Sequence, residues 1–169
     1  IITDNVGRAS GLVKSASVEV DFVKVLTVST NVAAATVSID SVFSATYSNY
    51  RVVMRHIKPV TDNQQLYLRW IDSSGSVLSA SNYRSLTAGG EAYSGGENNT
   101  QNRASWDGAF ANITPAGGTA SNSGATGGLY YDMMFYSPFS TVVMPFVTGN
   151  YANAKYSSFN IQTGNVSFF

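Results

Sequence analysis

The sequence contains no cysteine, little charge and no long apolar segment, and each of these absences excludes a class of protein. Without cysteine the chain can form no disulfide, no thiolate metal site and no cysteine nucleophile. Only 12% of the residues are charged, about half the usual share. No apolar run approaches the ~20 residues that cross a bilayer as a helix, so we expect no membrane insertion.

The charges that are present are balanced, and they are not arranged for chemistry. The chain has ten basic and ten acidic residues, whereas a nucleic-acid-binding domain shows a clustered basic excess. We therefore expect no nucleic acid as a partner. The single histidine, His56, follows no nucleophile motif, and neither a phosphate-binding loop nor a dinucleotide fingerprint occurs. We therefore predict that the protein is not an enzyme and has no catalytic residue, no metal and no cofactor.

A pair of acidic residues is the one arrangement here that is compatible with an enzyme, because a glycosidase needs only two carboxyl groups. Glu91, Glu97, Asp107 and Asp132 lie in or near the candidate loops and strands. The more economical interpretation is that these acids are solvated and that one of them pairs with an arginine.

The residues that are abundant favour β-structure. Tyrosine, phenylalanine, valine, serine and threonine are common, whereas the helix formers leucine, glutamate and lysine are scarce. Short stretches alternate between apolar and polar residues and are separated by turn signals. We predict an all-β fold, an antiparallel β-sandwich of jelly-roll-like form with about 8–10 strands.

The alternation begins after an irregular start. Residues 1–16 contain Gly7 and Gly11 and show no period, which predicts an N-terminal arm or connector, or equally a lead-in without fixed structure. Residues 17–169 are predicted to form a single β-sandwich domain. Because the first residue is Ile1, we also expect the chain to be part of a longer or processed protein.

The segment 49–70, "NYRVVMRHIKPVTDNQQLYLRW", is predicted to be a hairpin that turns at Asp62 and Asn63. In its first strand, strict alternation places Tyr50, Val52, Met54 and His56 on one face, and Arg51, Val53, Arg55 and Ile57 on the other. In the second strand Leu68 and Trp70 face the core.

Several further elements are expected along the chain. Short strands are predicted within 35–47, and the glycine-rich segments 88–103 and 115–128 are predicted to be long loops, where binding sites often lie. Pro145 predicts an edge strand or a bulge, and Thr163–Asn165 a tight turn between two closing strands.

If the hairpin forms, its arginines share one face with a tyrosine. Such a face can stack on sugar rings, contact another subunit or simply face solvent. An aromatic residue in the first glycine-rich segment and one just after it complete the candidates. The predicted receptor or subunit contacts are Arg51, Arg55, Tyr67, Arg69, Tyr93 and Trp106.

The order of short motifs resembles a family of virion proteins of tailed bacteriophages, particularly phages of marine bacteria and cyanobacteria. The motifs are "VFSATYSNYRVVM", "TDNQQLYLRWIDSSGSVLSASNY", a Gly/Ser/Asn-rich stretch with a lone "SW", "MMFYSPFST" and "FNIQTGNVSFF". The matching positions are Phe43, Tyr47, Asn49, Tyr50, Leu68, Arg69, Ser81, Tyr83, Ser137, Pro138, Thr163 and Gly164. The resemblance spans residues 36–169; Ser137 stands where the family has asparagine, and the "NVSFF" end lacks the family's more common polar-aromatic tail.

The resemblance implies a tail-fibre or appendage head domain that attaches a phage to its host, located in the virion. It also implies a homotrimer, contacts with other virion proteins through the N-terminal arm, and a host-surface glycan as a partner. Two alternatives stay open: a capsid decoration or capsid-fibre protein without a receptor role, and a cellular carbohydrate-binding module.

Overall fold

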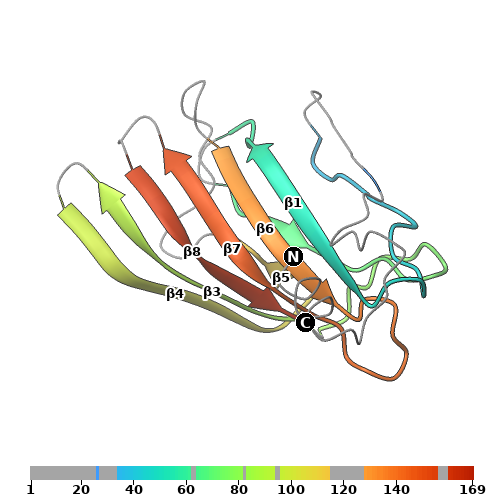
Figure 1. Ribbon diagram of the computed structural model, residues 1–169. Coiled ribbons are helices and arrows are strands. Elements are labelled where there is room, and N and C mark those ends of the chain that lie inside the picture. The colour runs from blue at the N-terminus through green and yellow to red at the C-terminus, as the bar shows by residue number, and fades with distance from the viewer. Residues whose placement is uncertain are drawn as a thin grey trace, which may run out of the picture.

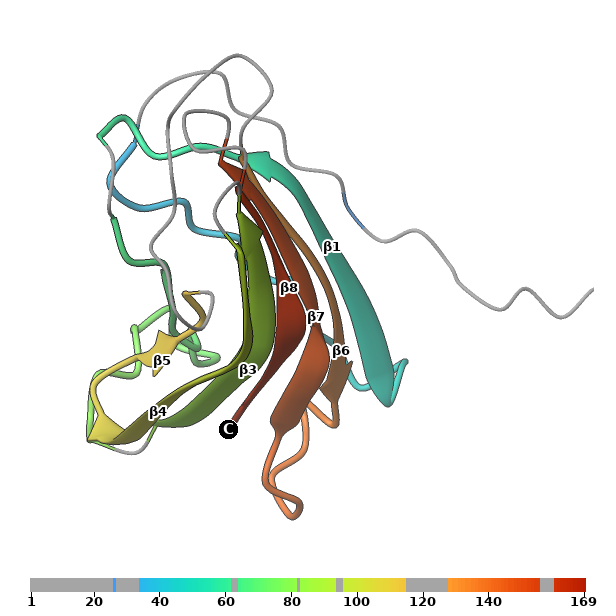
Figure 2. The ribbon, with the colours of Figure 1, turned by 90° about the vertical axis from the view of Figure 1, so that its left-hand side faces the viewer.

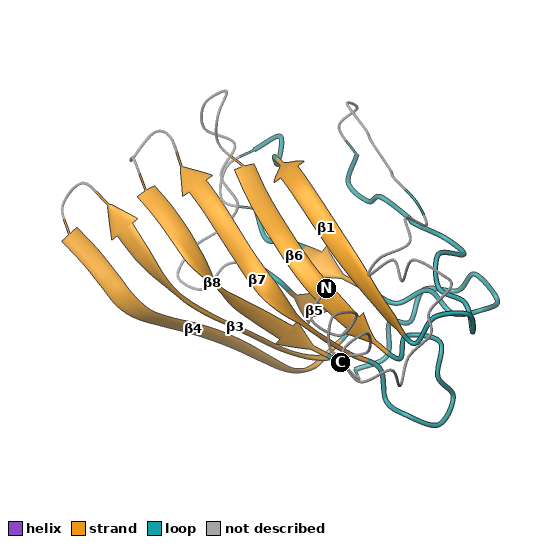
Figure 3. Ribbon diagram, in the orientation of Figure 1, coloured by secondary structure: helices purple, strands orange, loops and turns teal. Residues whose placement is uncertain are grey.

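A computed structural model describes residues 26, 34–61, 64–81, 83–93, 96–114, 128–155 and 160–169. The predicted N-terminal arm (1–16), residues 17–25 at the start of the predicted β-sandwich domain and most of the second glycine-rich segment lie outside the described residues. The described part contains strands and loops and no helix (Figure 3).

The larger layer is a curved antiparallel sheet of six strands in the order β1-β6-β7-β8-β3-β4 (Figure 1). The strands are β1 (Asn49–Ile57), β3 (Tyr83–Tyr93), β4 (Gly96–Gly108), β6 (Gly128–Tyr136), β7 (Phe146–Lys155) and β8 (Asn160–Phe168). Neighbouring strands run antiparallel in every pair. The meander β6-β7-β8 therefore joins strand β1 to the hairpin β3-β4.

The smaller layer is the two-stranded antiparallel sheet of β2 (Tyr67–Leu68) and β5 (Ala111–Asn112). It lies, with its adjoining loops, on one side of the curved sheet (Figure 2). The predicted all-β antiparallel fold is confirmed, and the unequal layers form an open sandwich. The jelly-roll order of strands is not confirmed by the eight strands that the structure describes.

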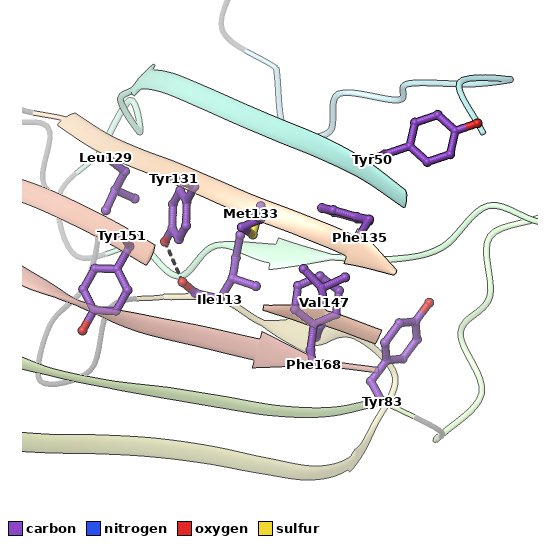
Figure 4. Packing of buried hydrophobic residues seen from close by; sticks show 11 residues of the cluster. Tyr50, Tyr83, Ile113, Leu129, Tyr131, Met133, Phe135, Val147, Tyr151 and Phe168 are labelled. Carbon is purple, nitrogen blue, oxygen red and sulfur yellow. Dashed lines mark hydrogen bonds between the residues drawn. The ribbon is translucent and has the colours of Figure 1, made fainter. Parts of the chain in front are cut away.

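Strand β6 shows how the sequence pattern builds the core. Leu129, Tyr131, Met133 and Phe135 are buried, and the residues between them are not. Because side chains alternate between the two faces of a strand, this period places all four on the inner face of the sheet (Figure 4). Residues of the smaller layer, led by the fully buried Ile113, cover them.

Aromatic rings fill one end of this core. Phe43 lies 4.9 Å from Tyr50 and 5.7 Å from Phe135, measured between ring centroids. Trp70 packs edge-on against Phe135 at 5.5 Å, and Phe168 lies 6.3 Å from Trp70. The Phe43–Phe135 pair is stacked and the others are edge-to-face or tilted, and such arrangements are favourable for aromatic pairs. The prediction that Trp70 and Leu68 face the core is confirmed.

Three tyrosines of the large sheet fasten the covering segments to it. Tyr131 donates a hydrogen bond of 2.5 Å to the carbonyl of Ile113. Tyr83 accepts from the amide of Trp70 at 2.8 Å and donates to the carbonyl of Leu78 at 2.9 Å. Tyr50 likewise binds the main chain of Ser44. Each phenol packs its ring in the core while its hydroxyl pairs with a main-chain group, and the bond made by Tyr131 is buried.

Gly164 of β8 makes room for another tyrosine. A Cβ on Gly164 would lie 2.6 Å from the Tyr151 hydroxyl oxygen and 2.6 Å from the Cα of Gly89. Residues Gly164, Tyr151 and Gly89 face one another across β8, β7 and β3. The glycine-rich "TGN" segment is therefore a packing feature inside a continuous strand, and the tight turn predicted there is wrong.

The hairpin predicted over residues 49–70 is also wrong. Strand β1 pairs with β6, far along the chain, and the short strand β2 pairs with β5. Propensity and turn residues describe only local sequence, whereas strand partners are chosen by the burial that the whole fold achieves. The two halves of this segment consequently lie in different layers.

A β-bulge reverses the predicted faces at the end of β1. The register with β6 shifts between Met54 and Ile57, and His56 has a φ of +57°. A bulge adds one residue to a strand and so changes which side chains face inward. As a result Ile57 packs against the core and His56 is exposed, the reverse of the strict alternation.

Three other predictions are corrected. Residues 88–103 form most of the long β3-β4 hairpin instead of a loop, because main-chain pairing needs no particular side chain. Residues 35–47 contain no strand. Pro145 precedes β7, a strand paired on both sides, so its missing N–H removes no ladder bond and it marks no edge strand.

Candidate functional site

The outer face of β1, β6 and β7 carries polar side chains and an exposed tyrosine next to two of the predicted contacts. Strand β6 turns Tyr130 and Asp132 outward, opposite the inward row that forms the core. Asn150 of β7 lies directly across from Asp132 in the register of the sheet. Arg51 reaches Asp132 from β1, so the two predicted contacts on that strand, Arg51 and Arg55, border the same face.

Arg51 and Asp132 form a two-point ion pair. Arg51 Nε donates to Asp132 Oδ1 at 2.7 Å, and Arg51 Nη2 donates to Asp132 Oδ2. These hydrogen bonds, then the charges of Arg51 and Arg55, hold the pKa of Asp132 below its usual value. The carboxylate therefore stays ionised and acts only as an acceptor. The expectation that one acid pairs with an arginine is confirmed.

The bulge in β1 brings His56 to the edge of this face. Its Nδ1 lies 3.4 Å from the Tyr130 hydroxyl oxygen, and the two rings meet edge to face at 6.5 Å. A positive φ is uncommon for a residue other than glycine, and such strain tends to occur where a side chain has a role. His56 thus supports the ring of Tyr130, which is 40% exposed.

Two shallow, open depressions lie on this face and share Asp132 and Asn150. The first has a volume of about 350 Å³ and is also lined by Arg51, Met134 and Thr148. The second, of about 290 Å³, extends towards Arg55, Tyr130 and Ala152. Asp132 and Asn150 therefore form a polar ridge between two hollows, within reach of a ligand in either.

The other two predicted arginine-face residues lie elsewhere, so the common face expected from the hairpin does not exist. Tyr67 belongs to β2 and Arg69 follows it, both in the smaller layer. Tyr67 packs on Phe110 with centroids 4.0 Å apart, and the Arg69 guanidinium carbon lies 5.6 Å from the same ring. This is a compact cation–π cluster whose members already contact one another.

The remaining predicted contacts, Tyr93 and Trp106, belong to β3 and β4. Their side chains lie outside the described residues, as do those of Glu91, Glu97 and Asp107. For these positions the sequence-based interpretation stays a prediction.

Neither a metal-binding cluster nor a membrane-spanning helix occurs in the described part of the chain. No group of three histidine or acidic side chains within it is placed to hold a metal ion. No helix there is long and apolar enough to cross a bilayer.

A second exposed feature is the turn between β6 and β7, residues 137–145, which projects beyond the end of the sheet (Figure 2). Val142 is 92% exposed and Met144 66% exposed. The Ser140 hydroxyl accepts hydrogen bonds from the amides of Val142 and Val143, at 3.1 and 2.8 Å. An apolar tip is thus held in one conformation in full contact with solvent.

Sequence reasoning did not single out this turn, or Tyr130 and Asn150. The alternation of residues 129–136 places Tyr130 on the same face of the strand as Asp132. Nothing in the sequence placed Asn150 beside them, because that neighbour comes from the pairing of β6 with β7.

Comparison with known proteins adds no relative. No protein-family model, no curated protein and no solved structure matches this chain. Its function is therefore inferred from its residues and their geometry.

Proposed function

We propose that this chain is a structural protein of a phage virion, the head domain of a tail fibre or appendage that assembles with copies of itself and attaches to the host surface. The motif resemblance over residues 36–169 supports this proposal, and the all-β fold is the fold that it implies. The low charge supports it too, because surface that is covered in an assembly needs few charges.

The observation that carries the assembly is the apolar turn between β6 and β7. None of residues 133–154 is charged, and within this stretch Val142, Val143 and Met144 are all more than half exposed. Exposed contiguous apolar surface of this kind marks interaction sites in soluble proteins. The hydrogen bonds to Ser140 hold the tip in shape before any partner arrives, which lowers the entropic cost of association.

The turn is also tied to the sheet. Ser137 has a φ of +50°, and its amide donates to the carbonyl of Ser48 at 2.8 Å, next to the start of β1. Tyr136 and Phe146, which flank the turn, stack in nearly parallel planes with centroids 4.5 Å apart. These contacts fix the base of the turn to the sheet, so the tip keeps its position when it contacts another subunit.

Light scattering coupled to size exclusion tests this proposal. We expect the wild-type chain to have a mass near three times 18.0 kDa. Changing Val142, Val143 and Met144 together to serine should give monomers with an unchanged far-ultraviolet circular dichroism spectrum. The matched control is Val60→Ser, at a loop valine that is 72% exposed, which should leave the mass unchanged.

A wild-type monomer at all concentrations, or a trimer that the triple change leaves intact, would contradict the assembly. Antibody labelling of the phage particle that encodes the chain, viewed by electron microscopy, then tests its place. Label at the tail supports a fibre or appendage, and label over the shell supports the capsid decoration alternative.

A cellular carbohydrate-binding module is the second candidate, and the hollows beside Asp132 and Asn150 favour it. It predicts a stable monomer that binds sugar without any virion. A monomeric mass together with sugar binding would support this second candidate over the first.

A further inference from the structure

Among the described residues of the sheet's outer face, those on β1, β6 and β7 have a distinct chemical character. Across the sheet, one register row runs from Asp132 of β6 through Asn150 and Asn165 to Ala88 and Asn102 on β4. Only the β6 end of this row has an ionised acceptor, an exposed aromatic ring and a hollow together. That end is where a polar ligand finds the most recognition groups.

The ion pair sets which ligand groups fit. Asp132 accepts two hydrogen bonds from Arg51, lines both hollows and, as a carboxylate, has further lone pairs. It can therefore accept two more hydrogen bonds from adjacent hydroxyl groups of a ligand. Asn150, directly opposite, supplies both a donor and an acceptor.

Tyr130 supplies an apolar surface next to these groups. It lines the same hollow as Asp132 and Asn150, and its contact with His56 limits the orientations of its ring. A sugar ring has one face of C–H groups that packs on an aromatic ring and an edge of hydroxyls that hydrogen-bond. The combination of Tyr130, Asp132 and Asn150 matches both sides of such a ring.

The size of the site is also suitable. The hollow that Tyr130 lines has a volume of about 290 Å³, which corresponds to roughly ten water molecules at ~30 Å³ each and is enough for a single sugar ring with its hydroxyls. Because the hollows are open, binding at one site should be weak, with a dissociation constant on the order of 1 mM. In an oligomer several such sites act together and raise the avidity on a glycan-covered surface.

We propose that the ridge of Asp132 and Asn150, with Tyr130 beside it, binds a neutral saccharide through two adjacent hydroxyl groups. The hydroxyls donate to the Asp132 carboxylate and pair with the Asn150 amide, and the C–H face of the ring lies on Tyr130. The host-surface role of this site rests on the proposed function, but the binding itself does not.

A neutral sugar fits better than an acidic one. Asp132 lies between the two hollows and lines both, so an anionic group in either would meet its negative charge. Arg51 is already engaged with that carboxylate. Arg55 adds positive charge to the second hollow only, where Asp132 again opposes an anion.

The test is a glycan array that presents neutral hexosides, deoxyhexosides and N-acetylhexosaminides next to uronic and sialic acids. An NMR titration with the best neutral monosaccharide glycoside then follows the Asn150 side-chain amide. We expect neutral sugars to bind and Asp132→Asn to weaken binding roughly ten- to hundredfold, the effect of losing hydrogen bonds to a charged group. Asn150→Ala should weaken it by up to about tenfold.

The matched control is Asn102→Ala. Asn102 is exposed and belongs to the same register row, but it lies three strands from Asn150, about 14 Å away. Its replacement should leave the affinity unchanged. Binding of acidic sugars alone, the absence of any neutral ligand, or neutral binding that survives both Asp132→Asn and Asn150→Ala would overturn the proposal.

These outcomes are independent of the proposed virion role. A trimer on labelled particles that binds no neutral sugar refutes the site and leaves the fibre assignment standing. A monomer that binds neutral sugar through Asp132 refutes the assembly and leaves the site standing.

Discussion

Replacing Tyr131 with phenylalanine tests whether buried tyrosines fasten the two layers together. Tyr131 is 2% exposed, and its hydroxyl donates to the carbonyl of the fully buried Ile113 at 2.5 Å (Figure 4). Tyr131→Phe keeps the ring and leaves that carbonyl without its phenol partner. An unsatisfied buried group costs about 1–3 kcal/mol, so we expect the free energy of unfolding to fall by that amount.

The chain supplies a control for the same chemical change one residue away. Tyr130 precedes Tyr131 on β6, but it faces outward and is 40% exposed. Its hydroxyl can exchange the long contact with His56 for water. Tyr130→Phe should therefore change the free energy of unfolding by no more than about 0.5 kcal/mol.

Urea unfolding followed by circular dichroism measures both variants. Protein concentration must be the same throughout, because assembly links stability to concentration. A shift in the midpoint of Tyr131→Phe with an unchanged slope indicates a loss of stability rather than a change in the exposed surface. In thermal unfolding each kcal/mol corresponds to roughly 2–4 °C. If both variants unfold at the same urea concentration, the tether between β6 and Ile113 does not stabilise the fold.

Three further predictions concern the same sheet. Burial raises the pKa of Tyr131 and of Tyr83 above the ordinary value of about 10. The folded state therefore holds these protons more tightly than the unfolded state, so the free energy of unfolding should fall as the pH rises above about 10. When the urea midpoint is followed against pH, this fall should be smaller in Tyr131→Phe. Gly164→Ala places a methyl group 2.6 Å from the Cα of Gly89 and from the Tyr151 hydroxyl oxygen, so it should lower the free energy of unfolding by at least about 1–3 kcal/mol. A urea midpoint equal to that of the wild type would show that β3, β7 and β8 are not closely packed there. The Thr87 hydroxyl is fully buried and has no hydrogen-bond partner in the described part of the chain. Thr87→Val should therefore raise the free energy of unfolding by up to about 1 kcal/mol. A lower midpoint of thermal unfolding in this variant would mean that the hydroxyl has a partner.

The candidate site shows where local sequence reasoning succeeds. Asp132 faces outward because β6 alternates with a period of two, whereas its pairing with Arg51 comes from the neighbouring strand β1. Arg51 and Arg55 were predicted as contacts and do border the site. Arg69 and Tyr67 were assigned to the same face only because a hairpin was assumed, and they lie in the other layer.

His56 shows where local reasoning fails. Strict alternation turned it inward, but one extra residue between Met54 and Ile57 turns it out towards Tyr130. A bulge leaves little trace in the sequence, since it depends on which partner strand is available and where that strand's side chains require space.

The amino-acid sequence by itself determined that this protein is all-β, which face of β6 is buried and that few charges remain on its surface. These properties follow from composition and from the two-residue period of a strand, both of which are local. Only the tertiary structure decided that β1 joins β6, that "TGN" continues a strand under Tyr151, and that Asn150 lies across from Asp132. Main-chain hydrogen bonds are alike in every pair of strands, so the choice of partner belongs to the packing of the whole core.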